Sequence, residues 1–544
     1  MGTKTYNNYE DLITYTRASK GHALRPVSYG DELVTNGTFN TDVSGWTETD
    51  ATTVSLSYDA GRLRVLSTAP YEGVYQDITT TVGRIYSFTR TVEGGTGTLR
   101  FRTYAGPASG GLVDLGGISA IDNGAGSTET FIFIATSTTT RIQMQSWNTF
   151  ADFWLDNISV KEVTFDESDG TLTLFEHPDN VPRVEWDSAG NRLGLLVEEA
   201  RTNLLPYSED FTVQSGRWAN GQKGDTSLTS GLTESPSMSD SVWKLFATSG
   251  TGTQIIQEDA TVSGATNVVG SVYLKKAEYK YGGIRLLDSS PSTGYSVFID
   301  LDDGSVFDTS TRGTPTTSDY RVQDAGNGWW RLSVITSSDG GSVNFTVGIS
   351  DGTSINSFDC VSFAGDGTSG IYIWGAQVEE GSFPTSYMKN EGTASGKDRS
   401  ADVASIPVAD FGFNQSAFTL LLNASWQHGS LSNKAVDLTN SNDSERVLIY
   451  NRGGTVGSYA VWDGNNVQAV SDGISSTTDF IKVGVGIAEN NFALINNGVV
   501  TSTDTLGTVP TPTDLKMRDF NGHIKSIQYY PRRLTNAQIQ ALTS

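Results

Sequence analysis

The sequence predicts an all-β protein built of tandem antiparallel β-sandwich domains of the jelly-roll type, with a short N-terminal anchoring segment. Two observations lead to this fold class. Many short segments alternate between apolar and polar residues, and clusters of glycine, threonine, asparagine and aspartate separate them. Long runs of helix-forming residues are missing, and the 59 glycines suit tight turns between strands. The 544 residues are enough for about three or four domains of ordinary size.

A pattern that occurs twice predicts that two of these domains are related. Leucine, phenylalanine and tryptophan open two stretches at identical spacing (L-x5-F-x6-W): Leu33, Phe39 and Trp46, then Leu205, Phe211 and Trp218. Each stretch closes on an aromatic strand with a valine and an acid, at residues 153–162 and 372–380. The copies differ in length and in the side chains of their closing strands, so we expect a shared fold without a necessarily shared ligand.

The pattern of strands and linkers divides the chain into six expected parts. They are an N-terminal attachment arm (1–30), a first β-sandwich (31–163), a connector (164–203), a second jelly-roll β-sandwich (204–390), a linker (391–402) and a third β-sandwich (403–544). The third part ends in a strand and a short helix. Thr535 and Gln538 have the spacing of a reciprocal capping box at the start of that helix.

The charge balance limits the partners. The net charge is −24 and no tract rich in lysine or arginine interrupts it, so we expect no nucleic-acid binding. No apolar stretch approaches the length of a membrane span, and we expect no membrane insertion. Residues 1–30 contain no apolar core of a secretory signal, which favours assembly in a cytoplasm. The single cysteine, Cys360, is expected to be a buried thiol on a strand.

The sequence shows no recognisable catalytic or metal-binding motif. The four histidines (His22, His177, His428 and His523) have no second histidine or cysteine at metal-ligand spacing. No nucleotide-binding loop and no G-x-S-x-G elbow occur. Adjacent acids on a strand point to opposite faces, so such pairs do not predict a glycosidase cleft. We therefore expect a non-enzymatic protein with no catalytic residue, no cofactor and no metal.

Sugar binding is the chemistry that the aromatic residues favour, because apolar sugar faces stack on tryptophan and tyrosine while polar neighbours hold the hydroxyls. The candidates in the first sandwich are Tyr71, Tyr75 and Trp147. Those in the third are Tyr459, Trp462, Asp463 and Asn465. The alternative is that these rings fill sandwich cores. We expect the core position for Trp46 and Trp426, and for Trp462 both positions stay open because it adjoins a turn.

The N-terminal 30 residues are locally basic on an acidic chain. Arg17, Lys20 and Arg25 are the candidate residues of an attachment arm that holds the protein to a larger assembly. The alternative is a terminus without fixed structure. The two interpretations are about equally supported by the sequence.

The connector carries the strongest resemblance to a known family. Its run Leu195-Leu196-Val197-Glu198-Glu199-Ala200-Arg201-Thr202-Asn203-Leu204-Leu205 is nearly identical, letter for letter, to the segment that introduces a jelly-roll in tailed-phage virion fibre and head-spike proteins. Residues 16–19 and 373–387 also resemble segments of that family. Residues 31–163 resemble carbohydrate-binding-module jelly-rolls, and residues 522–539 resemble the end of laminin-G and concanavalin-like lectin domains.

This resemblance implies a bacteriophage structural protein on the virion surface. It implies a head or tail fibre or spike, without distinguishing the two. The protein would be a homo-oligomer, with a trimer favoured, joined to other virion proteins through its N-terminus and displaying lectin-like modules to host surface glycans. Two alternatives stay open. One is a polysaccharide depolymerase with accessory binding modules, and the other is a secreted bacterial adhesin, which the missing leader disfavours.

Overall fold

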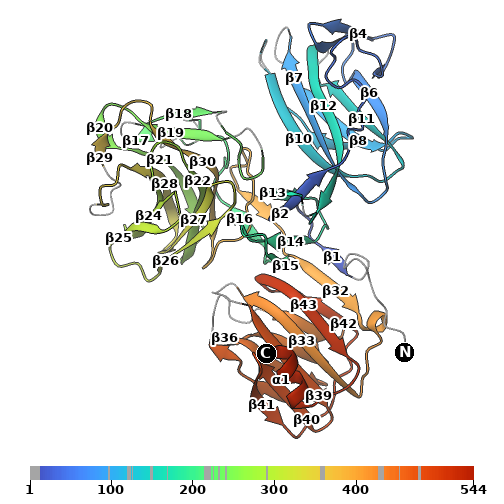
Figure 1. The fold of residues 1–544 in the computed structure, drawn as a ribbon, viewed down its shortest axis with the longest axis vertical. Helices are drawn as coiled ribbons and strands as arrows, with labels where there is room; N and C mark the ends of the chain where they lie inside the picture. The colour runs from blue at the N-terminus through green and yellow to red at the C-terminus, as the bar shows by residue number, and fades with distance from the viewer. Residues whose placement is uncertain are drawn as a thin grey trace. The chain divides into compact units, whose positions relative to one another are not determined.

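The computed structural model describes residues 13–544, apart from residues 96–98, 119–123, 125, 148–150, 168, 213–217, 219–221, 224–225, 231–232, 239–241, 289–291, 356–361, 427–433, 453 and 476–479. Within these residues the chain is almost entirely antiparallel β-structure, which confirms the predicted fold class (Figure 1). No helix in the described part is both long and apolar enough to cross a membrane. The chain forms two compact units, residues 26–171 and residues 1–25 with 172–544.

The unit of residues 26–171 is a two-sheet sandwich. One sheet has the order β10-β7-β12-β5-β4, with bounds Gly126–Ile134, Ile85–Gly94, Ala151–Phe165, Arg62–Ser67 and Val54–Asp59. The other has the order β3-β6-β11-β8-β9, with bounds Thr47–Glu48, Gly73–Thr79, Thr139–Ser146, Phe101–Pro107 and Val113–Gly116. The inward positions of both sheets form one apolar core that includes Phe39, Trp46, Phe88 and Phe153.

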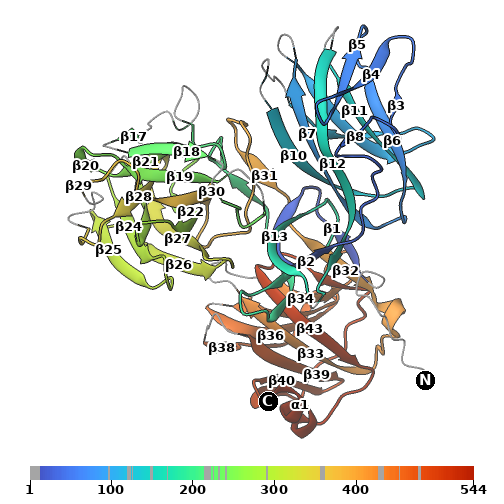
Figure 2. The same cartoon turned by 45° about the horizontal axis from the view of Figure 1, so that its top comes forward.

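The second sandwich lies within the other unit and also has two sheets (Figure 2). One has the order β17-β21-β28-β23-β24-β25, with bounds Gln222–Lys223, Ile255–Val262, Gly341–Ser350, Tyr281–Asp288, Gly294–Asp300 and Val306–Arg312. The other has the order β18-β19-β30-β22-β27-β26, with bounds Thr226–Ser230, Trp243–Ala247, Gly370–Glu380, Thr266–Lys276, Trp329–Ser338 and Ser318–Asp324. A short ladder joins β20 (Thr251–Thr253) to β29 (Ser362–Ala364).

The two sandwiches share one strand order, apart from an additional edge strand in each sheet of the second, β25 and β26. In each sandwich the closing aromatic strand lies between corresponding strands. β12 lies between β5 and β7, and β30 lies between β19 and β22. The repeated phenylalanine and tryptophan form equivalent core pairs, because the ring centroids of Phe39 and Trp46 are 5.9 Å apart and those of Phe211 and Trp218 are 4.7 Å apart. The repeated spacing therefore marks two copies of one packing arrangement, with large aromatic side chains that bury extensive apolar surface.

The third sandwich contains more of the chain than residues 403–544. One sheet has the order β1-β32-β42-β34-β35-β36-β37, with β38 (Ile474–Ser475) beside β36; the bounds are Thr14–Thr16, Val403–Pro407, Asp514–Met517, Lys434–Thr439, Arg446–Arg452, Thr455–Asp463 and Asn466–Ser471. The other has the order β14-β15-β43-β33-β39-β40-β41, with bounds Arg183–Trp186, Arg192–Val197, Gly522–Tyr530, Ala417–Trp426, Ile481–Ala488, Asn491–Asn496 and Val499–Asp504.

The terminal helix α1 (Asn536–Thr543) begins at the predicted capping box of Thr535 and Gln538. Its Ile539 packs with Leu421 and Ile495 on the outer face of the second of these sheets (Figure 1). Both faces of that sheet are thus buried, which explains the continuous apolar runs of β33 and β40 in place of alternation.

These pairings correct the expected boundaries of the arm, the connector and the linker. The arm supplies β1, which pairs with β32, and the connector supplies β14 and β15, whose Leu195 and Val197 enter the core of the third sandwich. The linker supplies β31 (Lys397–Arg399), which pairs with β16 (Arg201–Asn203). Arg17, Arg183 and Asp402 of these segments are buried because they pair with one another, whereas Lys20 and Asp398 stay exposed.

Candidate functional site

The outer face of the sheet β3-β6-β11-β8-β9 presents aromatic and polar side chains where the inner face is apolar. In β6, Val74 and Ile78 point into the core and Tyr75 lies between them on the other face. The strand register places one row of side chains across all five strands: Thr47, Tyr75, Gln143, Tyr104 and Asp114. Since directly opposed side chains on one face lie about 4.5–5.5 Å apart, the row forms a continuous surface.

Two exposed rings lie at the end of this face, where β11 finishes and β6 begins. Trp147 is 41% exposed and Tyr71 is 52% exposed, and their centroids are 4.9 Å apart in an edge-on arrangement at 88°. Tyr71 has a left-handed backbone conformation, with φ +63°. Such a conformation costs a bulky residue about 1–3 kcal/mol and is found most often at functional sites. The fold thus maintains a strained residue that holds an exposed ring against Trp147.

Charged side chains border the rings. The guanidinium of Arg141 lies 3.7 Å from the centroid of Tyr75 and donates two hydrogen bonds to Asp77, of 2.7 and 2.9 Å. Arg102 lies 5.7 Å from the centroid of Trp147. These contacts hold the rings in place from one side and leave donors and acceptors around them.

Tyr104 occupies the middle of the row. Burial, and after it the negative charge of Asp114, raises the pKa of the Tyr104 hydroxyl, so that this hydroxyl stays protonated and can donate a hydrogen bond. Gln143 donates to the side chain of Gln145 at 2.6 Å, which fixes the amide beside Tyr104. The face therefore combines flat apolar surface with oriented polar groups, which is the combination that holds a sugar ring.

The structure brings together the three predicted residues of the first sandwich, Tyr71, Tyr75 and Trp147, on this one face. Sequence reasoning missed four others that share it: Arg102, Tyr104, Arg141 and Gln143. The signal that could have found them is the alternation within residues 101–105 and 139–146, which places Arg102 and Tyr104, and Arg141 and Gln143, on one face of each strand. Trp46 is 7% exposed and lies in the core, as predicted.

The second sandwich does not repeat this face. The corresponding row across β21, β28, β23 and β24 consists of Gln257, Thr346, Arg285 and Ser296, all buried and without an aromatic ring. Arg285 donates to Thr346 at 3.1 Å and to Asn344 at 3.3 Å. The two copies thus share a fold and present different chemistry.

The predicted residues of the third sandwich do not form one surface. Tyr459 is fully buried in the core between the two sheets, so its assignment as a sugar contact is wrong. Trp462 and Asp463 end β36 and are half-buried, Asn465 occupies the left-handed turn position with φ +66°, and Asp463 accepts a hydrogen bond from Thr508. Trp426 lies in the core as predicted.

Of the three candidate anchor residues, two are buried and one is exposed. Arg17 and Arg25 are 1% and 3% exposed, and both serve contacts inside the chain's own fold, so neither can contact a partner. Arg25 donates to Nε2 of His177 at 3.1 Å. Lys20 is exposed and donates to Glu176 at 3.1 Å. The physical reason for the correction is that Arg17 neutralises the buried Asp402 and Arg25 is held against His177.

Asp402, from the expected linker, is the centre of a buried charge network. Its carboxylate accepts hydrogen bonds from the hydroxyl of Tyr15, from the guanidinium groups of Arg17 and Arg183 and from the backbone N–H of Glu198. The side chains of Arg17, Arg183 and Asp402 are completely inaccessible. Burial raises the pKa of Tyr15 strongly, so its hydroxyl remains a donor.

Glu198 is the second buried acid of the network. It pairs with Arg183 at 2.9 Å and with Arg399 at 3.6 Å, and it accepts from the backbone N–H of Ser386 at 2.8 Å. Burial acts to raise its pKa, but the two arginines outweigh it and lower the pKa of Glu198 to about 2. The network joins the N-terminal segment, the connector, the end of the second sandwich and the start of the third.

His523 links the connector to the third sandwich. Its Nε2 contacts Glu185 of β14 at 2.6 Å, and its Nδ1 contacts Ser425 of β33 at 3.4 Å. The order serine–histidine–glutamate is that of a hydrolytic triad, but Ser425 lies within a continuous strand and is 7% exposed. The sharp turn that exposes a nucleophilic serine is missing at this position, and the contacts tie three strands together.

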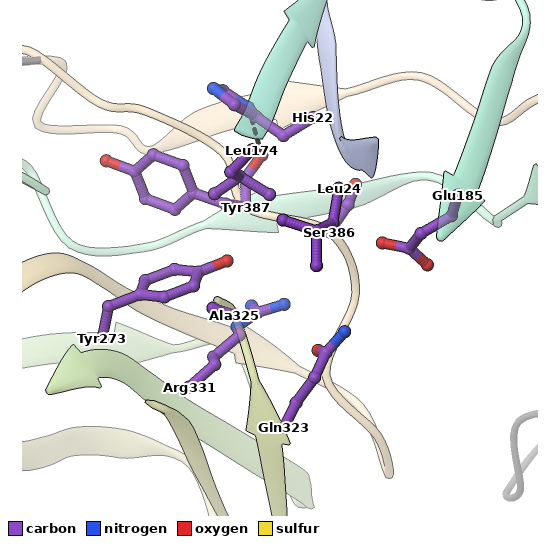
Figure 3. Close-up of a pocket in the computed structure, with 10 residues that line it drawn as sticks. All are labelled: His22, Leu24, Leu174, Glu185, Tyr273, Gln323, Ala325, Arg331, Ser386 and Tyr387. Carbon is purple, nitrogen blue, oxygen red and sulfur yellow. Dashed lines mark hydrogen bonds between the residues drawn. The ribbon is translucent and has the colours of Figure 1, made fainter. Parts of the chain in front are cut away.

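A small cavity lies near the charge network, bordered by His22, Glu185, Arg331, Ser386 and Tyr387 (Figure 3). Its volume is about 20 Å³, which is enough for one water molecule and too small for a sugar. His22 donates from Nδ1 to the carbonyl of Tyr387 at 2.9 Å. No group of three or more histidine, cysteine, aspartate or glutamate residues is placed to hold a metal among the residues described. Cys360 and His428 lie outside them.

Comparison with solved structures gives distant likenesses. No protein-family model matches the chain, and no curated protein matches it. A CBM4 structure is 14% identical, covers 24% of this chain and 99% of its own, and has a TM-score of 0.22. Domains LG4-5 of the mouse laminin α1 chain are 9% identical, cover 54% of this chain and 92% of their own, and have a TM-score of 0.18.

Trypanosoma rangeli sialidase in complex with sialic acid is 10% identical, covers 96% of this chain and 98% of its own, and has a TM-score of 0.22. Likenesses of this size assign neither a ligand nor an activity. What the structure itself defines is the class: a protein of tandem jelly-roll β-sandwiches, one of which has an exposed aromatic and polar sheet face.

Proposed function

We propose that this chain is a non-enzymatic glycan-binding protein whose ligand lies on the outer face of β3-β6-β11-β8-β9. The observation that carries the proposal is the exposed pair Tyr71 and Trp147, held at the end of a row of polar and aromatic side chains. Exposed aromatic rings with fixed polar neighbours suit stacking on a saccharide.

The test is retention of the full chain on glycans. In affinity electrophoresis through gels that contain bacterial capsular or cell-wall polysaccharides, the wild-type chain should be retarded by at least one of them. Trp147→Ala should lose the retardation, because it removes the larger of the two exposed rings on which a sugar would stack. Trp154→Ala is the matched control, since it removes a half-buried tryptophan from β12, in the other sheet of the same sandwich. Retardation of Trp147→Ala equal to that of the wild type would refute the proposed face.

The wider role follows from the connector's resemblance. The protein would be a fibre or spike of a phage virion, on the head or the tail, oligomeric with a trimer favoured, and assembled in the host cytoplasm. Sedimentation equilibrium at micromolar concentration tests the oligomer, and a monomer would contradict it. Removal of residues 1–12 tests attachment through the N-terminus, because it spares β1 and Arg17. Incorporation of that truncated chain into particles would contradict an anchor there.

A different measurement distinguishes the polysaccharide depolymerase from the non-enzymatic protein proposed above. Incubation with the polysaccharide that retards the chain, followed by a reducing-end assay, should release no sugar. Release that Ser425→Ala or Glu185→Gln abolishes would place hydrolysis at the serine–histidine–glutamate row and overturn the non-enzymatic proposal.

A further inference from the structure

The two arginines beside the exposed ring pair of Tyr71 and Trp147 differ in how firmly the chain itself holds them. Arg141 is saturated, because its guanidinium donates two hydrogen bonds to the carboxylate of Asp77. Arg102 is not, because its guanidinium donates a hydrogen bond to no residue in the described part of the chain. Of these two groups, the one next to Trp147 is therefore available to a ligand.

The ion pair of Arg102 with Asp114 is weak. Nε of Arg102 lies 3.8 Å from the carboxylate of Asp114, which exceeds hydrogen-bonding distance, and the two side chains are 36% and 45% exposed. The other carboxylate oxygen of Asp114 already accepts from the backbone N–H of Gly116 at 2.9 Å. Exposed ion pairs of this kind contribute little to stability, so an anionic group of a ligand can readily displace Asp114.

A second free donor lies beside Arg102. Gln145 of β11 is directly opposite Arg102 of β8 in the strand register, which places their Cβ atoms about 4.5–5.5 Å apart on the outer face. Gln145 is 8% exposed, and its carbonyl oxygen accepts from Gln143 at 2.6 Å. Its amide nitrogen reaches the outer face and donates to no other residue that the structure describes. Because a nearly buried amide without a partner is unfavourable, this nitrogen favours an acceptor from outside the chain.

The free groups of the face determine which ligand chemistry suits it. On the outward positions of the five strands the two arginines are matched by two aspartates, Asp77 and Asp114, so the face is formally neutral on a chain of net charge −24. The free guanidinium and the free amide nitrogen can only donate hydrogen bonds. A carboxylate satisfies both, because its two oxygens match the planar guanidinium with parallel charge-assisted hydrogen bonds.

We propose that this face binds an acidic polysaccharide, with the carboxylate of a uronic acid accepting from Arg102 and Gln145 while its sugar ring lies against the ring pair. This ligand class rests on the glycan-binding function proposed above and specifies its chemistry. The guanidinium carbon of Arg102 lies 5.7 Å from the centroid of the Trp147 ring, so a carboxylate on a sugar at that ring is within its reach. A neutral sugar at the same rings gains the stacking without the charge-assisted hydrogen bonds.

The test compares each acidic polysaccharide with its own neutral form. The full chain is titrated calorimetrically with polygalacturonate, alginate and hyaluronan, each before and after reduction of its carboxyl groups to alcohols. The reduction keeps the linkages between the sugars and removes the charge. At least one acidic polymer should bind, and its reduced form should bind roughly 10-fold more weakly or less, because the charge-assisted hydrogen bonds are lost.

Two variants assign the effect to the free donors. Arg102→Gln should lower the affinity for the acidic polymer roughly 10-fold and leave the affinity for the reduced polymer unchanged. Gln145→Glu should do the same, because the new carboxylate occupies Arg102 and repels the ligand. Arg84→Gln is the matched control, since Arg84 is exposed in the same sandwich and its 3.9 Å pair with Glu162 of β12 belongs to the other sheet. Arg102 is partly exposed, so its variant should keep the wild-type melting temperature.

Failure of the ligand class and failure of the glycan-binding face give different results. Equal affinity for the acidic and reduced polymers, with both lost in Trp147→Ala, would overturn the uronic acid and leave the face intact. Loss of both affinities in Arg102→Gln would make Arg102 a support for the Trp147 ring and would also overturn it. Binding of dextran sulfate in place of the three uronic-acid polymers would identify a sulfate ester instead. No binding of any acidic polymer also overturns the uronic acid, whereas the face itself fails only if the bacterial polysaccharides do not retard the chain either.

Discussion

Arg183 and Asp402 lie 219 residues apart in the sequence and form an ion pair in which neither side chain is accessible to solvent. Arg183 comes from the connector and Asp402 from the segment after the second sandwich. Around this pair, Tyr15 and Arg17 add the N-terminal segment. Three stretches that look like exposed linkers in the sequence thus meet in one buried cluster, and they can be buried because their opposite charges pair.

The first prediction concerns this cluster. Asp402→Asn leaves Arg17 without its counter-charge and leaves Arg183 paired with Glu198 alone. Removal of one partner from a buried pair costs about 3–5 kcal/mol. The unfolding transition of the third sandwich in differential scanning calorimetry should shift down clearly. Asp472→Asn is the matched control, because its pair with Arg452 is exposed and contributes about 0–1 kcal/mol. Equal stability of the two variants would contradict the structural role of the network.

A second prediction concerns mild acid. Burial, and after it the charge of Arg25, lowers the pKa of His177 well below its ordinary value of 6.5, and burial also lowers the pKa of His22. Both rings are neutral in the folded state, while the unfolded chain takes up protons on them below about pH 6.5. Stability should therefore be complete above that pH and fall as the pH drops from it towards the lowered values.

The acid step can be assigned with one substitution. His177→Gln keeps a side-chain acceptor for Arg25 and removes the titration, so the melting temperature should fall less between pH 7.5 and 5.5 than in the wild-type chain. An identical decline in both proteins would exclude His177 as its origin. Glu198, with its pKa lowered to about 2, should add a separate loss between about pH 4.5 and 2.

The third prediction concerns the strained tyrosine. Tyr71→Gly relieves the left-handed backbone, which glycine adopts without steric cost, and removes an exposed ring. We expect the first sandwich to be as stable as the wild type or more stable by up to about 1 kcal/mol, with loss of polysaccharide retardation. Calorimetry measures the stability of the variant, and affinity electrophoresis of the same sample measures its retardation by polysaccharide. A clear loss of stability would show that Tyr71 serves packing instead of binding.

The fourth prediction concerns the glycine beside Arg201. Gly381 has φ +144°, and a Cβ added there would overlap the guanidinium of Arg201. Gly381→Ala should therefore cost more than the backbone strain alone, roughly 2–4 kcal/mol, because it displaces the Arg201 side chain. Gly190→Ala is the control, since it has φ +80° with open space around it and should cost about 1 kcal/mol. Equal losses would argue against a fixed Arg201.

Alternation and the repeated L-x5-F-x6-W spacing were sufficient to predict three β-sandwiches and two related cores. Both signals are local, because strand periodicity and a ring at a fixed spacing depend on neighbours along the chain. The same local reasoning placed Trp46 and Trp426 in cores and put Tyr71, Tyr75 and Trp147 among the exposed candidates. It failed for Tyr459, whose inward orientation depends on the register of β36 against β35 and β37.

By itself, the sequence determined the fold class, the number of sandwiches and the aromatic residues of the first. Only the tertiary structure decided that the arm, the connector and the linker belong to the folded unit. Charged residues such as Arg17, Arg183, Glu198 and Asp402 indicate solvent exposure when they are considered singly, because burial of one unpaired charge is costly. Burial becomes possible only when chain segments about 200 residues apart supply opposite charges at hydrogen-bonding distance, and this pairing has no local signal in the sequence.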